Sequence, residues 1–77
     1  MEIQEFINHV AEQYDDVDVN EFSAATEFKK FEEWSSLTAL SILAMIGDEY
    51  GVKLKGEDMR QAVTVEDLYK MVESKIG

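Results

Sequence analysis

The chain has 77 residues, with 17 acidic side chains against seven basic ones and a net charge of −10. This length predicts one domain over residues 1–77, with little room for a large catalytic pocket. The absence of cysteine excludes disulfides and thiolate metal sites, and the negative charge argues against nucleic acid and anionic membranes as partners.

The first 35 residues divide into a predicted helix and a long loop. Residues 2–14 carry one apolar stripe at helical spacing, formed by Ile3, Phe6, Ile7, Val10 and Tyr14. Residues 15–35 begin with the acidic run DDVDVNE and show no sustained apolar periodicity. They are predicted to form a loop with a short helical turn around residues 27–33. We expect its aromatic side chains to attach it to the core, namely Phe22, Phe28, Phe31 and Trp34.

Residues 36–50 are predicted to form the second helix, and Gly51 is a suitable residue to end it. A complete core stripe runs along this segment through Ala39, Ile42, Leu43, Ile46 and Tyr50. A second apolar stripe, Leu37, Leu40 and Ala44, lies about 100° around the helix with Ser41 and Asp48 beside it. The helix is therefore either a central one that contacts neighbours on several sides or one that presents a docking surface for other proteins.

The remaining residues predict a short helix over 56–62 and a last helix that begins after Thr64. Asp67 lies three residues beyond Thr64, close to a capping box. The inner face of the last helix is predicted to contain Val65, Leu68, Tyr69, Val72 and Ile76. The expected fold is all-α, a four-helix bundle with three main helices and one short one.

Catalytic and metal-binding patterns are weak. His9, the one histidine, has no supporting pattern and is expected on the solvated surface, so Ser35 and Ser36 have no evident base. A calcium loop starting at Asp16 fails at its sixth position, where Glu21 replaces the required glycine. We therefore expect neither an enzyme nor a metal site, and the two serines by themselves indicate a helix cap.

The segment WSSLTALSILAMIGDEYGVKL, followed by KGEDMRQAVTVEDLYKMV, resembles the acyl carrier protein family of phosphopantetheine-binding carriers. The family pattern is Asp-Ser-Leu, a long helix, an acidic-aromatic-glycine ending, a connector and a Thr-Val start to the last helix. Here it corresponds to residues 35–37, 49–51 and 64–65, without gaps from Ser36 to about Val72. The chain departs from the pattern at Ser35, where the family has aspartate.

The resemblance implies that Ser36 carries covalent 4′-phosphopantetheine, added by a phosphopantetheinyl transferase from coenzyme A. Acyl chains would then be carried as thioesters for synthases and transferases that have basic docking surfaces. The family's docking face corresponds here to Glu33, Ser35, Leu37, Leu40, Ser41, Ala44, Asp48 and Leu54. Its acyl pocket corresponds to Ala39, Leu43, Ile46 and Ala62.

The finer function stays open between several interpretations. A carrier of fatty-acid or related acyl intermediates is expected, and a freestanding amino-acyl or polyketide carrier is the alternative within the family. Ser35 keeps a third interpretation open, an unmodified carrier-like interaction subunit. The acidic amino-terminal residues and the lack of a long apolar run favour a soluble, cytoplasmic protein. We expect it to be a monomer.

Overall fold

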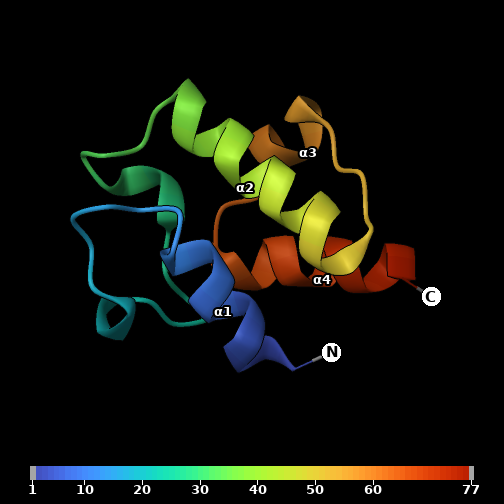
Figure 1. The fold of residues 1–77 in the computed structure, drawn as a ribbon, viewed down its shortest axis with the longest axis horizontal. Coiled ribbons are helices and arrows are strands. Elements are labelled where there is room, and N and C mark those ends of the chain that lie inside the picture. The colour runs from blue at the N-terminus through green and yellow to red at the C-terminus, as the bar shows by residue number, and fades with distance from the viewer. Residues whose placement is uncertain (1, 77) are drawn as a thin grey trace.

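The computed structural model describes residues 2–76, which form a bundle of four helices without strands in that range. The helices are α1 (Ile3–Ala11), α2 (Ser36–Tyr50), α3 (Gly56–Gln61) and α4 (Val65–Ile76). Two 3₁₀ turns, η1 (Val19–Glu21) and η2 (Phe28–Lys30), interrupt the long connection between α1 and α2. In Figure 1, α2 crosses in front of α4, while α3 lies beside the first half of α2.

The second helix has the predicted bounds because both of its ends carry strong signals. Ser35 is the N-cap residue, and its side-chain oxygen accepts a hydrogen bond from the backbone N–H of Thr38. At the other end Gly51 adopts the left-handed conformation, with φ 66°, and its N–H donates to the carbonyl of Gly47. The predicted caps of α2 are therefore confirmed.

Two predicted helical features are wrong. The first helix ends at Ala11 and not at Tyr14, because the N–H groups of Gln13 and Tyr14 bond to carbonyls three residues back, in turns. Tyr14 nevertheless reaches the core from the turn. Ile76 was expected on the inner face of α4, but it is 52% exposed because it lies in the last turn, beyond Val72.

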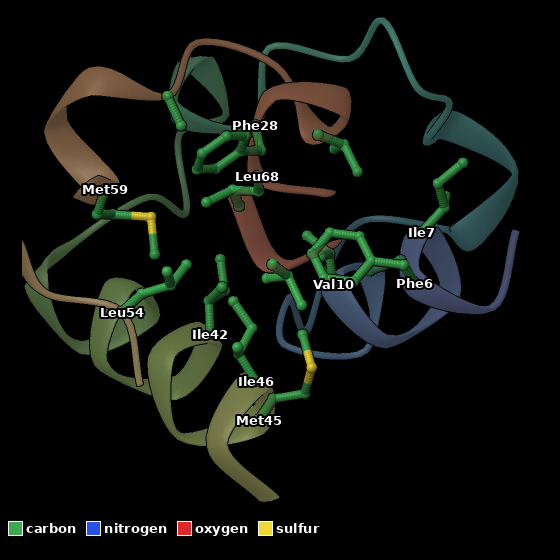
Figure 2. Packing of buried hydrophobic residues seen from close by; sticks show 14 of the residues in the cluster. Phe6, Ile7, Val10, Phe28, Ile42, Met45, Ile46, Leu54, Met59 and Leu68 are labelled. Carbon is green, nitrogen blue, oxygen red and sulfur yellow. The ribbon is translucent and has the colours of Figure 1, made fainter. Parts of the chain in front are cut away.

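One hydrophobic core lies between the helices and is supplied by all four of them. Figure 2 shows Ile42 and Ile46 projecting from α2 toward Leu68 of α4, with Phe6 and Val10 approaching from α1. These five side chains are completely buried. Met45 and Thr38 are also buried, which the predicted stripe of α2 did not include. The core therefore occupies one side of α2 and leaves the other side to solvent.

The long connection between α1 and α2 is ordered by contacts to several helices. Tyr14 donates its hydroxyl to the carbonyl of Phe28 at 2.5 Å. The first backbone N–H groups of α4, from Val65 and Glu66, donate to the carbonyls of Thr26 and Ala24. Phe22 and Phe28 are buried, and Phe31 and Trp34 are partly buried against the core, so the predicted attachment by aromatics is confirmed.

Gly47 is an exposed glycine inside α2, and replacing it with alanine is expected to stabilise the protein. A Cβ atom added there would meet only the carbonyl oxygen of Val52, at an ordinary distance of 3.9 Å. Glycine inside a helix costs about 0.5–1 kcal/mol relative to alanine. We therefore expect Gly47→Ala to raise the free energy of unfolding by that amount in urea denaturation. A lower stability would show that Val52 cannot accommodate the methyl group.

Candidate functional site

The beginning of α2 presents two neighbouring serines with different roles. Ser35 is engaged as the N-cap, since its Oγ lies 3.3 Å from both the backbone N and the Oγ1 of Thr38. Thr38 is itself buried and donates its hydroxyl to the carbonyl of Glu33 at 3.0 Å. Ser36, the first helical residue, is exposed, and its hydroxyl makes no hydrogen bond within residues 2–76. Both serines are exposed, and of the pair Ser36 has the hydroxyl that is not engaged in a hydrogen bond.

The electrostatic field at this helix end suits a negatively charged group. The first turn of α2 contains no acidic side chain, so the positive end of the helix dipole is not neutralised locally. The nearby carboxylate of Glu33 instead accepts hydrogen bonds from the backbone N–H groups of Asp15 and Asp16. Glu33 thereby attaches the end of the α1–α2 connection to its beginning, while Glu32 remains exposed.

A cavity of about 630 Å³ opens next to the two serines. It lies between the beginning of α2, the η2 segment and α3, and it is lined by Lys29, Trp34, Ser35, Ser36, Ala39, Leu40, Leu43, Gly56, Met59 and Arg60. Of the four residues assigned to an acyl pocket, Ala39 and Leu43 line this cavity. Ile46 and Ala62 are completely buried in the core and do not line it.

Half of the residues that line this cavity were not among the site residues predicted from the sequence. Trp34 could have been assigned to it, because it is an aromatic residue two positions before Ser36. Lys29, Met59 and Arg60 could not, because only the folded chain brings η2 and α3 together beside α2.

The second apolar stripe of α2 is on the surface. Leu37 and Leu40 are 75% and 61% exposed, and Ser41, Ala44 and Asp48 are exposed as well. These five residues are called the α2 outer face below. Leu54, which was grouped with them in the sequence, is 6% exposed and belongs to the core. It supports the connector after α2 and offers almost no surface of its own.

The expectation that His9 is solvated is wrong. Its Nδ1 lies 2.8 Å from the hydroxyl of Tyr50, and its Nε2 lies 3.9 Å from a carboxylate oxygen of Glu49. Tyr50 in turn packs against Phe6, with ring centroids 5.6 Å apart, and burial raises the pKa of its hydroxyl to about 12. The histidine therefore connects α1 to the end of α2, far along that helix from Ser36.

The acidic residues of the tested calcium loop have local structural roles. The carboxylate of Asp18 caps η1 by accepting the N–H of Asn20, and Glu21 completes the capping box by accepting the N–H of Asp18. Within residues 2–76, no three metal-ligating side chains are placed to hold an ion together. The same range contains no helix with the length and apolar character that a bilayer crossing requires.

The site therefore combines an exposed serine at the start of a long helix with an adjoining cavity lined largely by apolar side chains. Residues 4–72 match the family model described as phosphopantetheine attachment site, and the chain belongs to this family of carrier proteins. A comparison with curated proteins and one with solved structures gave no significant match. Members are not catalysts themselves. They carry covalent 4′-phosphopantetheine on a serine, receive it from a phosphopantetheinyl transferase and interact with biosynthetic enzymes.

The residues at the start of α2 fit such a group. The unengaged hydroxyl of Ser36 would be a suitable attachment point, and the unneutralised helix end would favour a phosphodiester there. The adjoining cavity would offer Trp34, Ala39 and Leu43 as apolar contacts for such a group.

Proposed function

We propose that Ser36 is the residue that carries 4′-phosphopantetheine and that the protein is an acyl carrier. The observation that supports this most is that the two serine hydroxyls differ in their hydrogen bonding. Ser35 uses its hydroxyl to cap α2, whereas the hydroxyl of Ser36 is exposed and unengaged. The bound group supplies a thiol, which this cysteine-free chain lacks, and acyl groups are carried on that thiol as thioesters.

The cargo is proposed to be an acyl intermediate of fatty-acid or related biosynthesis, delivered to partner enzymes. The protein's own residues provide the attachment point, hold the prosthetic group at the helix end and shelter its cargo. Trp34, Ala39 and Leu43 supply apolar surface in the cavity, which suits an acyl chain. To test this, the modified protein is loaded from an acyl coenzyme A and treated with neutral hydroxylamine. Release of the acyl group is expected, and a resistant adduct would contradict a thioester.

The α2 outer face is proposed to be the surface that enzymes bind. Exposed Leu37 and Leu40 offer apolar contact area, and Asp48 offers a charge that complements a basic partner. The net charge of −10 would accelerate encounter with such a partner. Because these side chains lie outside the core, they are available for binding without any rearrangement of the fold.

Changing Leu40 to aspartate is expected to weaken binding of a phosphopantetheinyl transferase at every salt concentration, because the lost contribution is burial of apolar surface. Asp48→Lys is expected to weaken binding mainly at low salt, where charge attraction is least screened. Affinity can be measured by calorimetry over a series of sodium chloride concentrations. Circular dichroism should show both variants folded. If Leu40→Asp unfolds the protein, Leu40 belongs to the core and the docking role fails.

Restoring the family's acidic residue, Ser35→Asp, is expected to accelerate modification by a general transferase. Aspartate caps helices about as well as serine, so α2 keeps its N-cap. A charge-assisted contact to a basic transferase residue contributes about 1.5–3 kcal/mol when well formed, which corresponds to roughly 10-fold or more in rate. The initial rate of incorporation is compared with that of Ser35→Asn, which caps without charge. Equal rates for the two variants would show that the transferase does not recognise this charge.

A further inference from the structure

The cavity beside Ser36 has a charge opposite to that of the whole protein. Two of the seven basic residues, Lys29 and Arg60, line it, and none of the 17 acidic residues does. Since acidic side chains outnumber basic ones by more than two to one, a lining with only cations is unexpected for this surface. The cavity therefore has a local preference for negative charge.

Lys29 fixes the position of this cationic lining. Its Nζ donates hydrogen bonds to the carbonyl oxygens of Met59 and Arg60, at 3.0 Å each. These carbonyls lie in the last turn of α3, where a cation is favourable because of the helix dipole. The side chain is partly buried, with Nζ 5.9 Å from the centre of the Phe28 ring. Lys29 thus attaches the part of α3 that carries Arg60 to η2.

The guanidinium of Arg60 has no partner of its own within residues 2–76. Its side chain forms neither an ion pair nor a hydrogen bond there, whereas its backbone carbonyl accepts a hydrogen bond from Lys29. Lys30 pairs with Glu27 at 3.2 Å and Lys70 with Glu66 at 4.0 Å, while the other lysines that form no ion pair in that range, Lys53, Lys55 and Lys75, do not line the cavity. Five N–H donors in a planar group, exposed at the edge of the cavity, are therefore available to an anion.

We propose that Arg60 binds an anionic oxygen group of whatever is attached to Ser36, with Lys29 as the residue that positions it. This inference rests on the proposed attachment at Ser36. The phosphodiester of the prosthetic arm is one source of such oxygens, because Ser36 and Arg60 line the same cavity. A carboxylate on the carried acyl group is the other source. In both cases Arg60 directs the attached group into the cavity, toward Trp34.

The chain is well suited to a direct test, because it contains one arginine and one tryptophan. Nuclear magnetic resonance of ¹⁵N-labelled protein therefore gives a single Arg60 Nε–H signal and a single Trp34 indole signal. Four forms are compared, namely unmodified protein, protein with the free prosthetic arm, and protein loaded with a butyryl or a succinyl group. These two cargoes have the same number of carbons, and only succinyl carries a carboxylate.

If the phosphodiester is the bound group, the Arg60 signal shifts downfield on modification and changes little between the loaded forms. If the carboxylate is bound, the shift appears only with succinyl. An Arg60 signal that is the same in all four forms overturns the proposal. The site of modification is mapped on the same samples. Lack of modification at Ser36 would contradict the proposed function, whereas a modified protein with an unresponsive Arg60 contradicts this inference alone.

Variants separate a specific contact from a general effect of charge. Arg60→Gln is expected to abolish the change in Trp34 fluorescence that accompanies modification or loading, and Arg60→Lys to retain part of it. Lys53→Gln is the matched control, because Lys53 is an exposed cation of the neighbouring connector that does not line this cavity. Lys29→Met is expected to reduce the Arg60 shift without removing it. Equal losses in Arg60→Gln and Lys53→Gln would overturn the proposal.

Discussion

Replacing Ser36 by alanine is expected to abolish incorporation of phosphopantetheine while the fold is retained. The hydroxyl is the proposed attachment point, and it makes no hydrogen bond that the fold requires. Alanine at the first helical position is also compatible with α2, because Ser35 still supplies the cap. Incorporation can be followed with a fluorescent coenzyme A conjugate and a phosphopantetheinyl transferase, and folding by circular dichroism.

Ser35→Ala is the matched control, and it should have the opposite pattern. It removes the N-cap acceptor for Thr38 and should lower the free energy of unfolding by about 1 kcal/mol. Labelling should persist, because the hydroxyl of Ser36 is unchanged. If Ser36→Ala is still labelled and Ser35→Ala is not, the two roles have been assigned to the wrong serines.

A large loss of stability is expected from Phe28→Ala. Phe28 is completely buried, and its ring meets Trp34 edge-on, with centroids 5.6 Å apart. Removing a buried phenyl ring costs about 3–5 kcal/mol through lost burial and the cavity left behind. A typical domain has a free energy of unfolding of about 5–15 kcal/mol, so this variant should lose a large part of its stability and unfold at a much lower urea concentration.

Phe31→Ala provides the comparison for this loss. Phe31 is only partly buried, against Tyr14 and Phe22, so its removal should cost distinctly less. Urea denaturation of both variants gives the two free energies of unfolding. A smaller cost for Phe28→Ala than for Phe31→Ala would mean that η2 is not the anchor of the long connection. The bonds from Lys29 to α3 would then not depend on the burial of the neighbouring Phe28.

The order of helices and the ends of α2 could be predicted because they depend on local chemistry. The cap at Ser35, the left-handed Gly51 and the apolar periodicity each act within a few residues. The start of α4 is similar, since Thr64 accepts the N–H of Asp67. The carboxylate of Asp67 accepts the N–H groups of Val63 and Thr64, and these backbone bonds lower its pKa.

Other features could not be predicted because they depend on contacts between distant segments. The apolar spacing at helical intervals continues past Ala11 to Tyr14, although the helix ends at Ala11. Tyr14 instead donates its hydroxyl to the carbonyl of Phe28. His9 is partly buried, and its hydrogen-bond partner Tyr50 lies 41 residues away in sequence.

The same limit applies to the candidate site. Ser36 and the α2 outer face could be predicted, because they depend on a short motif and on the periodicity of a single helix. The cationic lining of the cavity requires η2 and α3 to meet, and Lys29 reaches carbonyls 30 and 31 residues along the chain. No periodicity in the sequence indicates that contact.

The most direct test of the proposed function is to locate the prosthetic group on the wild-type protein. The protein is incubated with coenzyme A and a phosphopantetheinyl transferase, then digested with trypsin. Residues 31–53, between Lys30 and Lys53, form one peptide that contains Ser35, Ser36 and Ser41. Fragmentation in a mass spectrometer is expected to place a single phosphopantetheine on Ser36. A group on Ser35 or Ser41, or an unmodified peptide with every transferase tried, would contradict the assignment.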